Sequence, residues 1–220
     1  MSLILHFHPL SSFCHKVLIA LYENDTPFTP NLVNLQNEDE RNALRKLWPI
    51  GKFPVLEDKA RDWTVSESSI IIEYLDQHFP GRTRFIPPDP DLARQMRFRD
   101  RFFDLYIHLP MQKIVGDRLR PADKKDPHGV DEARTQMATA LGMVDHAMAA
   151  KTWAAGDTFT MADCAAAPAL FYADKVAPLA DKYPNAGAYL SRLTQRPSYA
   201  RALREAEPYF KYFPKENNGA

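Results

Sequence analysis

Two short segments in the first eighty residues combine groups that suit a small charged ligand. Lys52, Phe53 and Pro54 put a proline-constrained backbone beside a cation, and Glu67 and Ser68 follow with a carboxylate and a hydroxyl. A cis bond before Pro54 would turn the Phe53 backbone outward to pair with an extended peptide, whereas a trans proline on an edge strand is the ordinary alternative. If Glu67 and Ser68 open a helix, its N-terminus attracts a carboxylate while Glu67 accepts from an ammonium group. The pattern indicates a site for a short peptide with both charges at one end.

A second candidate site is the turn that contains Ser11, Ser12 and Cys14, just before an expected helix. Free N–H groups and the macrodipole at a helix start stabilise an anion, a thiolate included. The serines would otherwise only cap the helix, and Cys14 would pack in the core as free cysteines usually do. The residues alone leave these alternatives open.

Composition narrows the classes of partner. The 220 residues carry 28 basic and 28 acidic side chains, and this balance removes the electrostatic argument for nucleic acid or an anionic membrane. No apolar run reaches the roughly 20 residues of a membrane span, and no leader precedes the first expected strand, so we expect a mature cytoplasmic chain. Cys14 and Cys164 are too few for a disulfide scaffold and are expected to be reduced. His6 and His8 share a strand face without an evident third ligand, so no metal site is expected.

The first eighty residues mix strand and helix patterns. Apolar runs, alternation and turn residues predict strands at 3–7, 28–35, 53–57 and 63–65, and helices from residue 17, over 38–47 and from residue 66. The predicted order is βαβαββα. A proline-rich segment follows, through which neither helix nor strand can continue, so we expect domains at 1–80 and 91–220 joined by a linker at 81–90.

The second domain is expected to be all-helical. The periodicity predicts a long helix over about 92–119, a second over about 130–150, and shorter helices after residues 160, 184 and 197. Thr160 and Asp163 form a capping box, which is a folding signal. A run of charged side chains in the long helix is interpreted as a solvated face or a dimer surface: Arg94, Arg97, Arg99, Asp100, Arg101 and Asp104. An aromatic and apolar set is interpreted first as core: Phe102, Phe103, Tyr106, Ile107 and Met111.

The chain resembles the cytosolic glutathione transferases. The matching pieces, in family order, are Ser11-Ser12-Phe13-Cys14-His15-Lys16-Val17, Gly51-Lys52-Phe53-Pro54-Val55-Leu56, Ser66-Glu67-Ser68 with Ile71-Ile72-Glu73-Tyr74-Leu75, and Phe159-Thr160-Met161-Ala162-Asp163. The resemblance implies a thioredoxin-like domain that binds glutathione, a helical domain that forms most of the electrophile pocket, and a homodimer. It also implies conjugation of glutathione, as co-substrate, to small electrophiles, a detoxification reaction that transfers alkyl or aryl groups.

The resemblance assigns the glutathione-binding roles residue by residue. Phe53 and Pro54 match the backbone position that pairs with the cysteinyl part, and Lys52 matches a position that often contacts a glutathione carboxylate. Glu67 and Ser68 match the pair that holds the γ-glutamyl end. Tyr106 or Met111 would border the electrophile by analogy with the family.

Ser11 is the expected catalytic residue, because it occupies the place of the hydroxyl in serine-type branches such as theta, tau and zeta. Ser12 stands where tau-like and omega-like members usually have proline. Cys14 is a possible alternative nucleophile, which would give thiol-transferase or peroxidase chemistry. Two further alternatives are isomerisation of a maleylacetoacetate-type compound, for which Phe13 departs from the zeta pattern, and a glutathione-binding protein without catalysis.

Overall fold

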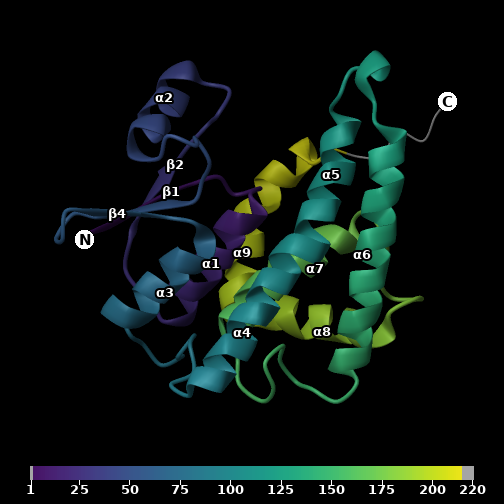
Figure 1. Cartoon of the computed structure of the whole chain (residues 1–220). Coiled ribbons are helices and arrows are strands. Elements are labelled where there is room, and N and C mark those ends of the chain that lie inside the picture. The colour runs from purple at the N-terminus through teal and green to yellow at the C-terminus, as the bar shows by residue number, and fades with distance from the viewer. Residues whose placement is uncertain (1, 215–220) are drawn as a thin grey trace.

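A four-stranded mixed sheet with three helices precedes a set of helices in the computed structural model, which describes residues 2–214 (Figure 1). The first part contains β1 Leu3–Phe7, α1 Ser12–Glu23, β2 Thr29–Leu32, α2 Glu38–Leu47, β3 Val55–Asp58, β4 Trp63–Ser66 and α3 Ser68–His78. The strand order is β2-β1-β3-β4, with β1 and β2 parallel and the other neighbours antiparallel. The predicted βαβαββα order is confirmed. The helix expected from Ser66 begins at Ser68, because Ser66 still pairs with Val55.

Helix α1 lies between the sheet and the helices that follow (Figure 1). It packs against α3 on the sheet side and against α7 and α9 on the other. Val17, Leu18, Ile19 and Leu21 are all at most 1% exposed, so α1 is buried around nearly its whole circumference. Because α1 is buried on all sides, its apolar residues join the two layers into one core.

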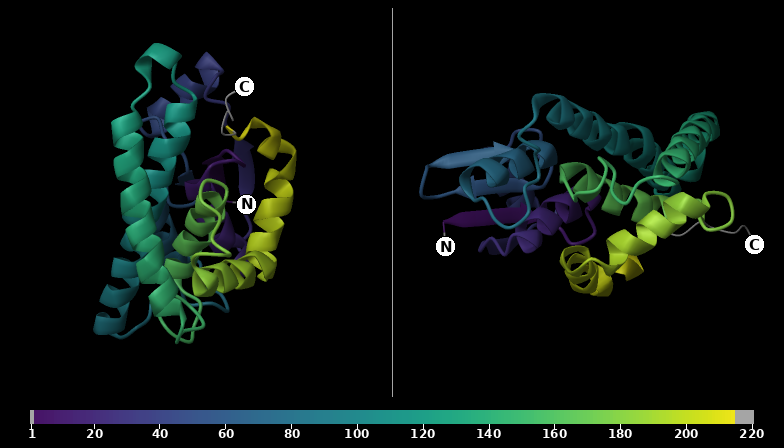
Figure 2. Two further views of the ribbon diagram at one scale, coloured as in Figure 1. Left: turned by 90° about the vertical axis from the view of Figure 1, so that its right-hand side faces the viewer. Right: turned by 90° about the horizontal axis from the view of Figure 1, so that it is seen from below.

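The second part of the chain is helical, as the sequence predicts. It contains α4 Pro90–Phe102, the π-helical segment η1 Phe103–His108, α5 Leu109–Arg118, a 3₁₀ turn Ala122–Lys124, α6 Pro127–Met148, α7 Met161–Asp174, α8 Pro184–Gln195, α9 Pro197–Ala206 and a last 3₁₀ segment Glu207–Tyr212. Figure 2 shows these helices stacked beside the sheet, with the sheet at one end. Residues 215–220 of the expected 91–220 domain lie outside the described residues.

The expected continuous helix over 92–119 is wrong in one respect. Between α4 and α5 the chain forms the π-helical turns of η1, in which the Leu109 N–H donates to the Asp104 carbonyl five residues back. Pro110 follows directly, and a proline lacks the N–H that a regular α-helical turn requires at this point. The widened turns of η1 lie in the part of this helical run that borders the cleft described below.

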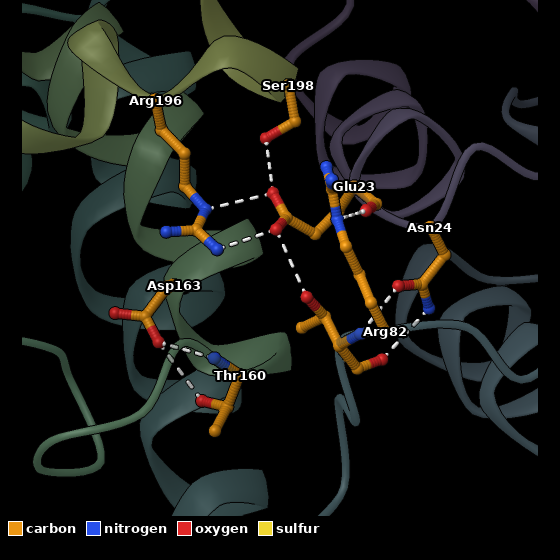
Figure 3. A network of polar contacts seen from close by, with 8 residues as sticks. Glu23, Asn24, Arg82, Thr160, Asp163, Arg196 and Ser198 are labelled. Carbon is orange, nitrogen blue, oxygen red and sulfur yellow. Dashed lines mark hydrogen bonds and ion pairs between the residues drawn. The ribbon is translucent and has the colours of Figure 1, made fainter.

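The C-terminal end of α1 is fastened by a buried ionic cluster (Figure 3). The Glu23 carboxylate accepts two hydrogen bonds from the Arg196 guanidinium at 2.9 and 2.6 Å and one from Ser198 at 2.8 Å. Thr83, in the segment between the two parts of the chain, donates a fourth at 3.1 Å. Burial alone would raise the pKa of Glu23, but these hydrogen bonds and the charge of Arg196 together lower it. The cluster holds α1, the connecting segment and the α8–α9 junction together.

The capping box at the start of α7 is confirmed. The Asp163 carboxylate accepts from the Thr160 N–H at 2.8 Å and from the Thr160 hydroxyl at 3.1 Å. Its other oxygen accepts from the Ala154 N–H at 2.8 Å and the Tyr189 hydroxyl at 2.5 Å. Asp163 is fully buried with all these bonds made, as a structural cap should be.

Candidate active site

A cleft of about 660 Å³ opens between the two parts of the chain. It brings together residues from the starts of α1 and α3, the turn before β3, and the α4–η1–α5 run. The alternative nucleophile Cys14 is not part of its lining. Every other residue that the sequence assigns to glutathione binding or to catalysis does line it, namely Ser11, Lys52, Phe53, Pro54, Glu67 and Ser68. These groups lie far apart in the sequence but share one site.

Ser11 is the N-cap of α1, and its side chain lines the cleft. Its backbone is extended, and its Oγ accepts from the Cys14 N–H at 3.3 Å. Because the hydroxyl uses a lone pair for the helix, its own proton remains available to a group in the cleft. An anion placed there would meet both this hydroxyl and the positive end of α1.

The peptide bond between Phe53 and Pro54 is cis. Phe53 precedes β3, and no backbone hydrogen bond of Phe53 occurs within residues 2–214. The Phe53 ring stacks on His8 with 6.0 Å between ring centroids. The exposed Lys52 side chain extends the same lining and makes no ion pair with any described residue. This edge can therefore pair with the backbone of an extended ligand and offer it a cation.

Glu67 and Ser68 stand at the start of α3. Glu67 is the N-cap position with a φ of 69°, a left-handed conformation that is uncommon outside glycine. Its carboxylate is exposed and makes no hydrogen bond or ion pair within the described part of the chain. Beside it, Ser68 and the free N–H groups of the first turn of α3 can bind a carboxylate. One end of the cleft thus suits a ligand carbon that carries both an ammonium and a carboxylate group.

A buried ionic cluster forms the wall beside this end, and here one sequence interpretation is wrong. Asp100 and Asp104 are not on a solvated face, since they are 1% and 8% exposed. The ammonium of the fully buried Lys16 lies 2.7 Å from Asp100 Oδ1 and 2.8 Å from Asp104 Oδ2, and it donates to Ser69 at 2.8 Å. Ser69 in turn donates to Asp100 at 2.7 Å. Both carboxylates face inward, where their negative charges offset the charge of the buried Lys16 ammonium.

The arginines of the same run divide between solvent and the cleft. Arg94 pairs with Asp91 in an exposed contact, as a solvated face predicts. Arg97 makes two hydrogen bonds with Glu73 of α3, and both Arg97 and Arg101 line the cleft. The expected solvated or dimer face is therefore only part of this helix surface.

Neither of the other two candidates in the α1 turn faces the cleft. Ser12 is buried, and its Oγ lies 2.8 Å from Nε2 of His108 in η1. Cys14 is fully buried, and burial raises the pKa of its thiol to about 12 despite hydrogen bonds with Ser11 and His8 that act in the other direction. A thiol in this state supplies little thiolate near neutral pH, so the geometry favours Ser11 among the three.

Apolar side chains of α1, η1, α5 and α7 also line the cleft. They are Phe13, Leu105, Leu109 and Met161, joined by Gln112. The two residues named from family analogy do not belong to this lining, because Met111 is buried and Tyr106 is exposed elsewhere. The sequence does not reveal this set because its members come from four elements, α1, η1, α5 and α7, that only the fold brings together.

No group of three or more His, Cys, Asp or Glu side chains within residues 2–214 is arranged to hold a metal ion. His6 instead bonds Glu57 and Asn31, each at 2.8 Å, and His8 accepts from the Leu10 N–H. No described helix is long and apolar enough to cross a bilayer.

Comparisons with known proteins agree with this geometry. A family model for the glutathione S-transferase N-terminal domain matches residues 5–83, and one for the C-terminal domain matches residues 103–197. The chain is 27% identical over 209 residues to glutathione S-transferase F6 of Arabidopsis thaliana, covering 89% of this chain and 96% of the relative. It is 28% identical over 202 residues to a stringent starvation protein A homolog of Haemophilus ducreyi, covering 89% and 87%.

Solved structures show the same fold. A glutathione S-transferase of Methylobacillus flagellatus with glutathione bound superposes with a TM-score of 0.83 at 22% identity, covering 91% of this chain and 98% of that one. A glutathione S-transferase of Methylobacterium radiotolerans in complex with glutathione sulfonate gives a TM-score of 0.79 at 25% identity, covering 99% and 97%.

Proposed function

Since the chain belongs to the cytosolic glutathione transferase family, we propose that it conjugates the thiolate of glutathione to small electrophiles. The observation that carries this proposal is the convergence of two helix N-termini on one cleft. The start of α1 presents Ser11, and the start of α3 presents Glu67 and Ser68. A γ-glutamyl peptide that spans the cleft would place its charged head at α3 and its sulfur near α1.

Each contact has a distinct role in this proposal. Glu67 accepts from the ligand ammonium, and Ser68 with the first turn of α3 binds the α-carboxylate. The backbone of Phe53 pairs with the cysteinyl residue, and Lys52 neutralises the glycyl carboxylate. These contacts bind glutathione without changing during the reaction, so they set affinity rather than rate.

Ser11 is the proposed catalytic residue. Its hydroxyl donates to the glutathione sulfur and stabilises the thiolate, while the thiol proton passes to solvent. The thiolate then forms a sulfur–carbon bond with the electrophile as a leaving group departs, or adds to a polarised double bond whose neighbouring carbon takes up a proton. Lowering a reference thiol pKa near 8.5 by two units requires about 2.7 kcal/mol. One charge-assisted hydrogen bond and a helix terminus supply energies of this order.

The decisive experiment measures glutathione binding by calorimetry and conjugation with a panel of electrophiles. Ser11→Ala removes the hydrogen bond but keeps the helix terminus, so we expect the bound thiol to titrate about one and a half pH units higher. Conjugation near pH 6 should then slow roughly 30-fold, while glutathione affinity stays within threefold. Ser191→Ala, which alters an exposed serine of α8, is the control and should be unchanged. Affinity weaker than millimolar in the unmodified protein would discard the proposal, and an unchanged Ser11→Ala would remove Ser11 from it.

Dimerisation and location belong to the same proposal. Helices α3 and α4 expose Ile70, Leu92 and Phe98, each about half exposed, and such apolar side chains suit a homodimer interface of the family kind. Light scattering on the purified chain tests this.

Both cysteines are free, which fits a cytoplasmic protein that acts in detoxification.

A further inference from the structure

Two buried polar contacts join the start of α1 to the π-helical segment η1 at matching intervals. Ser12 Oγ lies 2.8 Å from Nε2 of His108, and Lys16 donates to Asp104 at 2.8 Å. Ser12 and Lys16 are four residues apart on α1, and Asp104 and His108 are four residues apart on η1. Residues at this interval share one helix face, so the two contacts run side by side between the two helices. We call them the α1–η1 ladder.

Each end of the ladder lies in or beside the cleft lining: Asp104 is part of that lining, and Lys16 donates to Ser69, which also lines the cleft. Ser12 lies between Ser11 and Phe13, Asp104 precedes Leu105, and His108 precedes Leu109. The ladder therefore links the proposed thiolate-activating residue to the apolar wall that faces the electrophile. The Phe13 ring also meets the His108 imidazole edge-on, with 4.5 Å between centroids.

Building on the proposed function, we propose that Ser12 and His108, with the Lys16–Asp104 contact, are positioning residues that hold Ser11 at a fixed distance from the electrophile wall. The contacts suit this role because they are shielded from water. Ser12, Lys16, Asp104 and His108 are all less than 9% exposed. A hydrogen bond in such surroundings is stronger than at the surface, and losing one partner leaves the other buried and unsatisfied.

The charge states support a fixed contact. Burial, and secondarily the charge of Lys16, lowers the pKa of His108 to about 3, so its imidazole is neutral at physiological pH. A neutral imidazole and a hydroxyl can satisfy each other without an excess charge. The Lys16 ammonium keeps Asp100 and Ser69 as partners in addition to Asp104, so its end of the ladder is the more rigid.

The test compares variants that remove the ladder contact with one that removes a similar contact outside it. Ser12→Ala deletes the hydroxyl, Ser12→Thr retains it, and Asp104→Ala deletes the second contact while Asp100 and Ser69 still hold Lys16. The control is Tyr172→Phe, which removes a 2.8 Å hydrogen bond from α7 to the Leu10 carbonyl in the same loop but leaves the ladder intact.

We expect Ser12→Ala to raise the thiol pKa of bound glutathione by about one unit, to slow conjugation near pH 6 roughly tenfold, and to raise KM for the electrophile. Calorimetric affinity for glutathione should stay within twofold, because Glu67, Ser68 and Phe53 are untouched. Ser12→Thr should restore at least half of the lost rate. Tyr172→Phe should lower thermal stability without moving the thiol pKa.

Hydrogen exchange on the free protein separates this inference from the proposed activity. Ser12→Ala and Asp104→Ala should each increase exchange of the Cys14 and His15 amides severalfold, whereas Tyr172→Phe should not. If exchange is unchanged in both Ser12→Ala and Asp104→Ala, the ladder does not hold the start of α1, and this conclusion does not depend on whether the protein conjugates glutathione. If exchange rises but the thiol pKa and the KM for the electrophile stay fixed while Ser11→Ala is impaired, the ladder is structural and its positioning role is refuted. If the unmodified protein binds no glutathione, the proposed function fails and this role fails with it.

Discussion

At its C-terminal end α1 is held by Glu23, whose carboxylate accepts four hydrogen bonds, whereas at its N-terminal end Ser11 caps the helix through a single contact at 3.3 Å. Glu23 is buried, and Ser11 borders a cleft. The Glu23 carboxylate at one end of the helix thus accepts four hydrogen bonds, whereas the Ser11 hydroxyl at the other end still has its own proton to donate. The difference indicates that the C-terminal end secures the fold and leaves the N-terminal hydroxyl free to meet a ligand.

The largest effect is expected when the Glu23 carboxylate, which holds the C-terminal end of α1, is removed. Glu23→Ala leaves the Arg196 guanidinium and the Ser198 hydroxyl without their acceptor, and we expect the free energy of unfolding to fall by about 3 kcal/mol. For a chain of this size that lowers Tm by roughly 9 °C. Glutathione affinity of the folded protein should not change.

Asp91→Ala is the control for this prediction. It breaks the exposed Arg94–Asp91 pair, in which both side chains are 74% exposed, and such pairs contribute about 0–1 kcal/mol. Thermal unfolding followed by circular dichroism measures both variants. Equal losses in the two would mean that the Glu23 cluster is no stronger than a surface contact.

A smaller effect is expected at the ligand-binding side. In Glu67→Gln the ammonium of glutathione loses a charged acceptor, and we expect about tenfold weaker binding, or about 1.4 kcal/mol. Stability should hardly change, because no described residue pairs with this carboxylate. Calorimetry against Glu132→Gln, an exposed glutamate of α6, provides the comparison. Binding as tight as in the unmodified protein would remove Glu67 from the site.

The two buried ionic clusters that involve α1, one around Glu23 and one around Lys16, should also respond to acid in opposite directions. The pKa of Glu23 is lowered from 4.5, so its contribution to stability is present above that value and is lost as pH falls through the folded-state pKa. Burial raises the pKa of Asp104 from 3.8 in spite of Lys16, so its contribution is greatest at low pH and is lost as pH rises through the folded-state pKa.

Replacing each carboxylate by an amide, which does not titrate, should reveal its contribution to the pH dependence of stability. Glu23→Gln should flatten the decline of stability below pH 4.5, whereas Asp104→Asn should make stability rise more steeply with pH above 3.8. Each slope should change by at most about 1.4 kcal/mol per pH unit, the effect of one proton. Urea unfolding across this range measures the slopes, and slopes that shift in the same direction would contradict the assignment.

The smallest effect is expected at Cys14. Its thiol is buried with a pKa of about 12, so Cys14→Ala should leave conjugation and thiol–disulfide exchange within twofold. Mass spectrometry after incubation with oxidised glutathione should find no adduct on Cys14 in the native protein. An adduct, or a tenfold loss in either rate, would restore this cysteine as a nucleophile.

The sequence predicts what depends on neighbouring residues. The element order in the first domain, the capping box at Thr160 and the cleft-lining residues proposed to bind glutathione all follow from short local patterns. Lys52 to Pro54 and Glu67 to Ser68 could be recognised because each motif is contiguous and stands at the end of an element.

Contacts between residues that lie far apart in the sequence leave no local pattern from which they could be predicted. Lys16 meets Asp104 across 88 positions and Ser12 meets His108 across 96. A lysine beside apolar residues in a helix, or an aspartate in a charged run, is usually exposed, and only the packing of α1 against η1 reverses this. Pro110 was the one local sign that the long helix would be irregular.

The backbone at Glu67 has a consequence for any attempt to improve the protein. A non-glycine residue at φ 69° carries strain of about 1–3 kcal/mol, which glycine would relieve. A selection for heat resistance alone should therefore favour glycine at this position, and the more robust variants it returns would have lost the carboxylate. Thermostable descendants of this chain should be screened for ligand affinity before stability is taken as an improvement.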